Sequence, residues 1–302
     1  MKIIICDVGD AACAFVTSPK GYTMMIDCGS SDNKDNPVDT FKRNKNWLGS
    51  IDYVTRYNRS YQIALLHITH PDDDHVRNAN KVIAEIPPYL LHRTRYELFS
   101  DGEDVNTDYK EKIDKQYRGD NTESIPWGFD INETFRIMPS MCRNNDYLKE
   151  KERNNSSIVR YINADGVGIL FCGDLETPGW EYLVNNDSHF VNLVKTNGVN
   201  ILIAPHHGHK SGFPKALFNI IGEVDCVIHS KDTEASKEGT DISTQYYSKS
   251  KGVPYKALSD NNIYYGRVLT TRSNGNIFIS TGRNGSYTIY TDKASSNHKQ
   301  IN

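Results

Sequence analysis

The sequence lacks paired cysteine motifs, long apolar runs and a strong excess of charge of either sign. Its six cysteines show no CxxC spacing, so buried free thiols are expected rather than a disulfide framework. No stretch reaches the roughly twenty apolar residues that a membrane-spanning helix needs. Asp7 and Asp10 interrupt the N-terminal run MKIIICDVGD before a signal-peptide core could form. We therefore expect a cytoplasmic protein with no membrane partner.

The net charge of −3 over 302 residues offers no overall basic surface for nucleic acid, although a local basic groove is compatible with that total. Hydrophobic residues make up 37% and charged residues 24% of the chain, which is typical of a folded globular protein and not of a disordered one. The length suits one large α/β domain or two small ones. The oligomeric state cannot be predicted from these features.

Short β-rich runs alternate with helical or polar segments along the chain. Gly, Asp, Asn or Pro bounds each run, as is usual for strands. The runs are MKIIICDV, YTMMID, QIALLHITH, FRIMP, SIVRYI, VGILFCGD, NILIAPHH, VDCVIHS and NIFISTG. Between two of them, Asp165 and Gly166 supply the Asp-Gly pair of a tight hairpin turn. The pattern predicts two sheets with helices.

The stretch HITHPDDDH places three histidines and three aspartates in nine positions, directly after the apolar run IALL. IALL is typical of a buried strand, and α/β sheets usually carry their chemistry where such strands end. The candidate metal ligands of this loop are His70, Asp72, Asp74 and His75. So many ligands favour two divalent ions that share a bridging ligand. The alternative, a helix N-terminus capped by aspartates, explains Asp72 or Asp73 but not the flanking histidines.

Two further strand ends carry side chains of the same type. GILFCGDLE ends in Asp174, and NILIAPHHGHKSG contains His206, His207 and His209. Taken singly, Asp174 could cap a helix and the histidines could form a surface loop. Three such strand ends in one chain predict a shared metal centre.

The motifs resemble the metallo-β-lactamase fold, and specifically the branch formed by the soluble domain of ComEC-type DNA-uptake proteins and their free-standing relatives. That branch carries SHPDxDH where other members carry HxHxDH, and THPDDDH matches it. CDVG, MMIDCG, FRIMPS, RNNSSIVRY, LFCGDLE, IAPHHGHKSG and TRSNGNIFIS follow in family order. The resemblance implies an α/β protein, a four-layer αββα sandwich over residues 1–283. Residues 87–132 would form a cap insertion after the metal-binding loop, and residues 284–302 a polar C-terminal tail.

Three departures from the family pattern affect the expected metal. The family motif DVGQGD is DVGDAA here, Asp72 stands in place of the second histidine, and His209 stands where a serine is usual. No histidine between His92 and Asp174 can serve as the usual third ligand, and NNSS occupies that part of the chain. The first metal site is therefore richer in oxygen, which favours manganese or magnesium over tightly held zinc.

The resemblance also implies the site residues. It implies two divalent metal ions, manganese or zinc with magnesium as a further candidate, which polarise a phosphoryl oxygen and activate a water for in-line attack. The predicted metal ligands are His70, Asp72, Asp74, His75, Asp174 and His206. The predicted catalytic residues are Asp74, His207 and Lys210, with an orienting partner as the alternative for His207 and a solvated side chain for Lys210. The predicted substrate-binding residues are Asn155, Ser157, Arg93 and Arg95, with a turn or a solvated face as the alternative.

We therefore predict a metal-dependent hydrolase, most directly a phosphodiesterase or nuclease that acts on DNA or a nucleotide. One alternative is a non-catalytic or regulatory metal-binding module of the same fold, and another is a hydrolase of a thioester or lactam-like substrate, because a fold does not fix its substrate. The predicted cap is expected to cover the metal cleft and to favour a short or single-stranded substrate, although a solvated helical layer explains its composition equally well.

Overall fold

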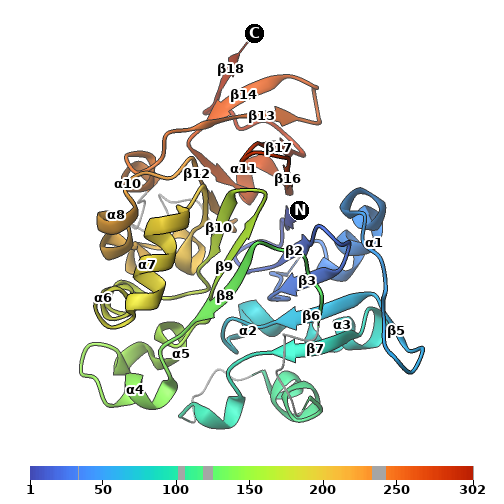
Figure 1. Cartoon of the computed structure of the whole chain (residues 1–302), viewed down its shortest axis with the longest axis vertical. Helices are drawn as coiled ribbons and strands as arrows, with labels where there is room; N and C mark the ends of the chain where they lie inside the picture. Colours follow the sequence, from blue (N-terminus) through green and yellow to red (C-terminus); the bar gives the residue numbers. More distant parts are fainter. Residues whose placement is uncertain (33, 101–105, 118–124, 233–242, 302) are drawn as a thin grey trace.

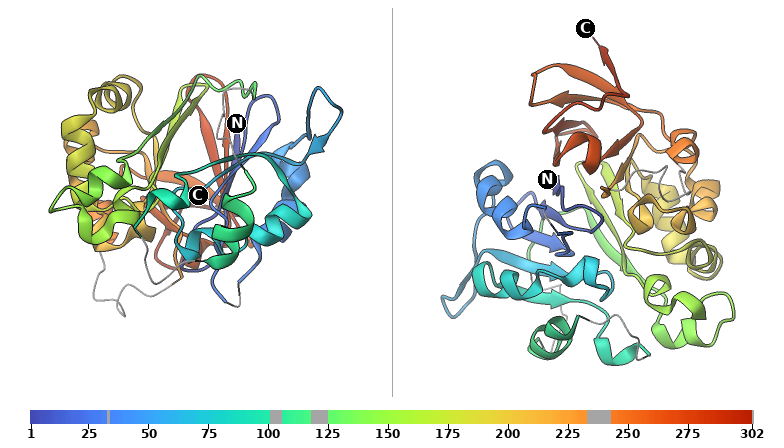
Figure 2. Two further views of the ribbon diagram at one scale, coloured as in Figure 1. Left: turned by 90° about the horizontal axis from the view of Figure 1, so that it is seen from below. Right: turned by 180° about the vertical axis from the view of Figure 1, so that it is seen from behind.

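The structure is a computed structural model, and it describes all residues except 33, 101–105, 118–124, 233–242 and 302. Two large β-sheets face each other, and helices cover the outer face of each sheet (Figures 1 and 2). This is the four-layer αββα arrangement that the sequence predicts. No helix in the described ranges is long and apolar enough to cross a membrane.

The larger sheet has ten strands in the order β18-β14-β13-β17-β16-β1-β2-β3-β6-β7. Its strands are β1 (Lys2–Ile5), β2 (Ala14–Thr17), β3 (Thr23–Ile26), β6 (Ile63–His67), β7 (Pro88–His92), β13 (Val253–Ala257), β14 (Ile263–Gly266), β16 (Ile277–Thr281), β17 (Tyr287–Thr291) and β18 (Lys299–Ile301). β3, β6 and β7 run parallel to one another. Their carboxyl ends therefore meet at one edge, where the predicted metal-binding loop begins.

The smaller sheet has six strands in the order β15-β12-β11-β10-β9-β8. Its strands are β8 (Ile131–Phe135), β9 (Val159–Ala164), β10 (Val167–Phe171), β11 (Ile201–Ile203), β12 (Cys226–His229) and β15 (Val268–Thr270). Asp165 and Gly166 join β9 to β10 with φ angles of 57° and 81°. Both central residues thus have the positive φ of a type I′ hairpin turn, which confirms the predicted turn.

Three apolar clusters separate the layers. The cluster between the sheets contains Ile3 from β1, Met24 from β3 and Ile169 from β10, all fully buried. A second cluster joins the outer face of the small sheet to helices and includes Trp180. A third joins the outer face of the large sheet to helices and includes Phe41. Burial of strand residues on both faces explains why the runs are apolar throughout rather than alternating.

Helices on the large sheet include α1 (Pro37–Leu48), α2 (Asp73–Val76), α3 (Ala79–Glu85) and the helical segment η2 (Tyr109–Asp114). Helices on the small sheet include α4 (Pro139–Arg143), α5 (Glu152–Asn155), α6 (Thr177–Asn186), α7 (Ser188–Asn197), α8 (Lys215–Ile221) and α10 (Ser243–Tyr247). Short helical turns are η1 (Tyr96–Leu98), η3 (Lys149–Lys151), η4 (Pro205–Gly208) and η5 (Lys210–Gly212), and α11 (Thr271–Asn274) precedes β16. The hairpin β4 (Tyr53–Val54) and β5 (Ser60–Tyr61) forms a separate small sheet.

Two segments differ from their predicted roles. The predicted C-terminal tail supplies β17 and β18, and β17 pairs with β16 along its whole length. Its polar composition hid a strand in which Ile289 faces the core. The predicted cap, residues 87–132, supplies the edge strand β7 and the buried Trp127 between the sheets. Part of that segment is thus sandwich, and residues 101–105 and 118–124 lie outside the described residues.

The structure also tests the predictions for the cysteines and for the run FRIMP. All six cysteines are buried and free, which confirms the expectation of unpaired thiols. The run FRIMP was expected to be a strand, but β8 ends at Phe135, and Pro139 occupies the first turn of α4. Proline is favoured at that helical position because its missing N–H has no partner there in any case.

Candidate metal centre

Loops from three strand ends meet at one site. The loop after β6 leads into α2, the loop after β10 contains Asp174, and the turn after β11 contains His206 and His207. The loops after β6 and β10 approach closely at Gly173, where an added Cβ would lie 2.8 Å from the Thr69 Cβ. Gly173 also has a φ of 53°, so the site needs glycine here for both space and backbone conformation.

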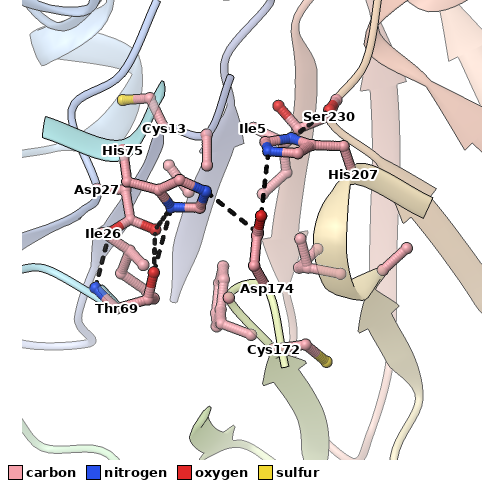
Figure 3. Close-up of a pocket in the computed structure, with 16 residues that line it drawn as sticks. Ile5, Cys13, Ile26, Asp27, Thr69, His75, Cys172, Asp174, His207 and Ser230 are labelled. Carbon is pink, nitrogen blue, oxygen red and sulfur yellow. Dashed lines mark hydrogen bonds and ion pairs between the residues drawn. The ribbon is translucent and has the colours of Figure 1, made fainter. Parts of the chain in front are cut away.

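Asp174 lies at the centre of the site, and four histidine rings surround it. Its Oδ1 is 3.1 Å from His75 Nε2, and its Oδ2 is 3.7 Å from the Nε2 atoms of both His206 and His207. The Nε2 of His70 lies 4.0 Å from the same Oδ2. Figure 3 shows His75 and His207 approaching Asp174 from opposite sides. Asp174 itself is 4% exposed, so this carboxylate faces the imidazoles rather than solvent.

The Nδ1 atoms of these rings face other partners. His75 Nδ1 contacts Asp27 Oδ2 at 2.8 Å, and His207 Nδ1 donates to the Ser230 carbonyl at 2.9 Å. His206 Nδ1 lies 3.0 Å from Ser211 Oγ. Because the other ring nitrogen is occupied, each Nε2 is oriented toward Asp174. Fixing one nitrogen to present the other is the usual way in which proteins position histidine ligands.

His206 and His207 both adopt left-handed backbone conformations, with φ angles of 50° and 52°. Two consecutive residues of this kind are uncommon outside glycine, and such strain is concentrated at functional sites. The conformation turns both rings toward Asp174 instead of alternating them as an extended chain would.

Two further aspartates complete the cluster. Asp74 Oδ2 lies 3.1 Å from His207 Nε2, and one ligand atom from each of Asp74, His75, Asp174 and His207 falls within 4.8 Å of the others. Asp72 Oδ2 lies 3.7 Å from His70 Nε2. Asp72 Oδ1 forms an ion pair with Arg153 Nε from α5 at 3.2 Å.

In the cluster, protonated imidazoles pair with ionised carboxylates. Burial alone would lower the pKa of His75, but the charges of Asp174 and Asp27 raise it well above its usual value. Burial opposes ionisation of Asp174 too, yet His75 and His207 hold the pKa of Asp174 well below its usual range. Protons thus occupy the nitrogens that would bind a cation, so cation binding would release protons.

The pKa values of His70 and Asp72 shift in the opposite direction to those of His75 and Asp174. Burial, and then the charge of His75, lowers the pKa of His70 to about 3. Burial raises the pKa of Asp72 to about 6, although Arg153 opposes that shift. His70 is therefore a neutral imidazole near neutral pH, which is the form that binds a metal.

The residues fit a divalent metal. The Nε2 atom of His70 is buried and makes no hydrogen bond within the described residues. Such buried polar atoms are costly unless a partner satisfies them, and a cation would do so. A mixed set of imidazole and carboxylate donors suits zinc, manganese or iron more than calcium. The cluster is therefore a candidate site for divalent metal.

A small cavity adjoins this cluster. Its volume is about 40 Å³, room for one or two water-sized groups. Among its lining residues, His75, Asp174 and His207 are polar and Ile5 is apolar (Figure 3). The apolar Ile203 also lines it.

The remaining predicted residues take different places. Ser157 is buried, and its Oγ accepts a hydrogen bond from the Asp174 N–H at 3.0 Å, so it supports the position of Asp174. Asn155 is also buried and donates to the Leu148 carbonyl. Lys210 is exposed on η5, directly beyond the histidine turn. Their roles toward substrate stay predictions.

The surroundings of Arg93 show that its predicted role in substrate binding was wrong. Its side chain is 1% exposed, forms an ion pair with Asp114 at 2.7 Å and donates to the carbonyls of Asp114 and Tyr117. These contacts fasten β7 to η2 and leave no free face for a phosphate, so Arg93 has a structural role. Arg95 is exposed and pairs with Glu97.

Two carboxylates at the site were not predicted. Asp27 directly follows β3, accepts hydrogen bonds from the N–H and hydroxyl of Thr69 and orients His75. Glu176 Oε1 lies 3.5 Å from His206 Nδ1. Asp27 carries the same signal as Asp174, a carboxylate directly after an apolar strand, and YTMMID could have indicated it.

No family model and no curated protein matches the chain. Among solved structures, a metallo-beta-lactamase with a HARLDQ motif from Cronobacter sakazakii is similar with 15% identity and a TM-score of 0.36, over 70% of this chain and 78% of that chain. The metallo-beta-lactamase fold protein YhfI from Bacillus subtilis is similar with 9% identity and a TM-score of 0.33, over 68% and 71% of the two chains.

These likenesses are distant, and the ComEC-type resemblance rests on the sequence motifs alone and stays a prediction. The four-layer αββα fold rests on the chain's own two facing sheets and the helices that cover them.

Proposed function

We propose that this protein is a metal-dependent hydrolase that cleaves phosphodiester bonds in DNA or in a nucleotide. The observation that carries the proposal is the convergence of four imidazole Nε2 atoms on the single buried carboxylate of Asp174. A purely structural ion pair needs one imidazole, whereas four imidazoles with further carboxylates match the ligand number of a two-metal site.

The ligands assigned to two divalent ions, manganese or zinc with magnesium as a further candidate, are His70, Asp72, Asp74, His75, Asp174 and His206. His207 is added to this set, since its Nε2 lies within the same group of atoms. Bound ions would supply the positive charge that polarises a phosphoryl oxygen and lowers the pKa of a water. Asp27 and Ser157 act through other residues, by orienting His75 and Asp174.

Positive side chains beside the cluster support an anionic substrate. Arg153 lies against Asp72 and is partly exposed, and Lys210 is exposed beyond the histidine turn. Positive charges that approach a phosphate bound at the cluster would stabilise the additional negative charge of a phosphoryl transition state. A neutral lactam or thioester would gain less from them.

The test compares Asp174→Asn with Asp146→Asn, which changes an exposed aspartate that forms an ion pair with Lys149. Metal-free protein is supplied with manganese, and hydrolysis of bis(p-nitrophenyl) phosphate and of a labelled oligonucleotide is followed. We expect the parent and Asp146→Asn to be equally active. Asp174→Asn should lose more than about a hundredfold in kcat/KM, because even outer partners of metal ligands are worth about 10- to 100-fold.

Other outcomes point to the alternatives. Hydrolysis of a chromogenic lactam or a thioester, with no phosphodiester cleavage, would assign the site to carbonyl substrates. Tight metal binding without hydrolysis of either class would favour a non-catalytic metal-binding module.

A further inference from the structure

A second cavity lies at the other end of the parallel strands from the candidate metal centre. The β4–β5 hairpin projects from the body of the protein beside the start of β7 (Figures 1 and 2). Between the hairpin and β7 is an open cavity of about 780 Å³, within the size range of small-ligand sites. We call it the tyrosine surface, and it is lined by Tyr53, Tyr57, Tyr61 and Tyr89 together with Arg56 and Arg59.

Aromatic contacts fix the hairpin against the large sheet. Tyr53 and Tyr89 are stacked with ring centroids 4.7 Å apart, and Tyr61 and Tyr89 are 5.3 Å apart. Tyr22 closes the row with an edge contact to Tyr53 at 5.5 Å. A two-stranded hairpin alone is marginal in water, so this row explains why the tyrosine surface is preformed.

The tip of the hairpin offers an exposed ring beneath a cation. Tyr57 is 71% exposed, which is unusual for a large aromatic side chain. The Arg56 guanidinium lies 4.8 Å from the centroid of this ring. A flat ligand could stack on the same ring, and an arginine over an aromatic ring contributes further to such binding.

The charge of the tyrosine surface is positive. Arg56 and Arg59 form no ion pair with any described residue, whereas Asp52 at the base of the hairpin is occupied by Lys45 at 2.8 Å and by Ser60 at 2.9 Å. The cations of the run FKRNKNW on α1 differ, since Lys42 and Arg43 both pair with carboxylates. The two guanidiniums of the tyrosine surface therefore remain available to an anionic ligand.

We propose that the tyrosine surface binds single-stranded nucleic acid, with bases stacked on tyrosine rings and phosphates beside Arg56 and Arg59. Stacking aromatic rings interleaved with unpaired cations are the usual means of binding such strands without sequence preference. A proline-rich peptide or a neutral glycan would use the rings but would have no need of the guanidiniums.

The position of the surface gives it a place in the proposed function, and this step rests on that function. β6 leads from the tyrosine surface to the metal-binding loop. Nine residue steps separate Tyr61 from His70, which at about 3.3 Å each span at most about 30 Å. A strand with a rise of about 3.4 Å per nucleotide covers that distance in about nine nucleotides. Oligonucleotides longer than this should reach both sites. Their KM should therefore be lower than the KM of a dinucleotide, which is too short to reach both.

Binding is measured by fluorescence anisotropy of a labelled twelve-residue oligothymidine and the full chain in the presence of a chelator, which prevents cleavage. We expect Tyr57→Ala to raise the Kd about 5- to 150-fold, as for loss of one stacked base. Arg56→Gln with Arg59→Gln should raise it further and lower the slope of log K against log salt by about 1.4, at about 0.7 per phosphate contact. The matched control, Lys42→Gln with Arg43→Gln, removes two cations of α1 and should leave the Kd unchanged.

Retention of parental affinity by Tyr57→Ala and by the double arginine variant, with native circular dichroism, would overturn the proposal. So would absence of binding by the parent, or tighter binding of a proline-rich peptide than of the oligonucleotide. The failure of the proposed function is separate. If Asp174→Asn and the parent both bind the oligonucleotide and neither cleaves it, the surface stands and the phosphodiesterase assignment falls.

Discussion

Removal of the His92 imidazole should flatten the dependence of folding stability on pH. His92 and His67 lie outside the metal centre, with stacked rings and Nδ1 atoms 2.7 Å apart. The Nη2 of buried Arg160 lies 3.4 Å from His92 Nδ1. Burial, and then the positive charge of Arg160, lowers the pKa of His92 from 6.5 to about 3. His92 is therefore neutral in the folded protein near neutral pH.

The size of the effect follows from linkage. Because the folded pKa lies below the unfolded value, the unfolded chain takes up the proton first as pH falls. The stability linked to His92 is fully present above about pH 6.5 and declines from there toward about pH 3. Each pH unit in that window corresponds to about 1.4 kcal/mol, so His92 alone should remove about 2 kcal/mol between about pH 7.5 and about pH 5.

The assay is urea unfolding of the metal-free protein at both pH values, for the parent and for His92→Gln. Gln retains a hydrogen-bonding group beside His67 but has no proton to gain. We expect the loss of unfolding free energy over this pH range to be smaller by about 2 kcal/mol in His92→Gln. His189→Gln, which changes an exposed histidine paired with Glu133, serves as the control. Equal pH dependence in the parent and His92→Gln would refute the reasoning.

Two substitutions near the metal centre give further predictions. Asparagine tolerates the left-handed backbone of Asp27, at a φ of 55°. Asp27→Asn therefore removes only the charge that orients His75. Calorimetry should show metal affinity about 10- to 100-fold weaker. Unchanged affinity would remove Asp27 from the site. An added Cβ on Gly29 would lie 1.5 Å from the Asp74 carbonyl, so Gly29→Ala should displace the metal-binding loop and also weaken metal binding. Gly49→Ala adds a Cβ with nothing within 4 Å. The φ of 65° makes this variant less stable, but Gly49 caps the end of α1, so metal affinity should stay at the parental value. Equal affinity in both glycine variants would contradict this.

The grouping of the candidate ligands could be predicted from the sequence where they follow directly on apolar strands. His70, Asp174 and His206 each come within a few residues of a buried run. Asp174 and His206 follow the parallel neighbours β10 and β11, whose carboxyl ends meet at one edge. His70 follows β6, which lies in the other sheet. The role of Asp27 needed a further fact, the parallel pairing of β3 with β6. That pairing joins residues some forty positions apart, which local patterns do not specify.

The wrong or missed predictions also depend on contacts between residues that are far apart in the sequence. Arg93 stands in a basic, tyrosine-rich stretch, and only the fold reveals that Asp114 neutralises it twenty-one residues later. β17 was missed because its apolar residues are few, and its pairing with β16 makes it a strand. The tyrosine surface combines a hairpin with Tyr89 from a distant strand, so its residues formed no motif in the sequence.

The most direct test of the central claim is the number of divalent ions that the protein binds with and without the Asp174 carboxylate. Metal-free parent, Asp174→Asn and Asp146→Asn are titrated with manganese, and bound metal is measured after dialysis. We predict two equivalents for the parent and for Asp146→Asn, and at most weak, partial binding for Asp174→Asn, whose overall fold should persist. Two equivalents in all three proteins, or none in the parent, would contradict a metal centre built around Asp174.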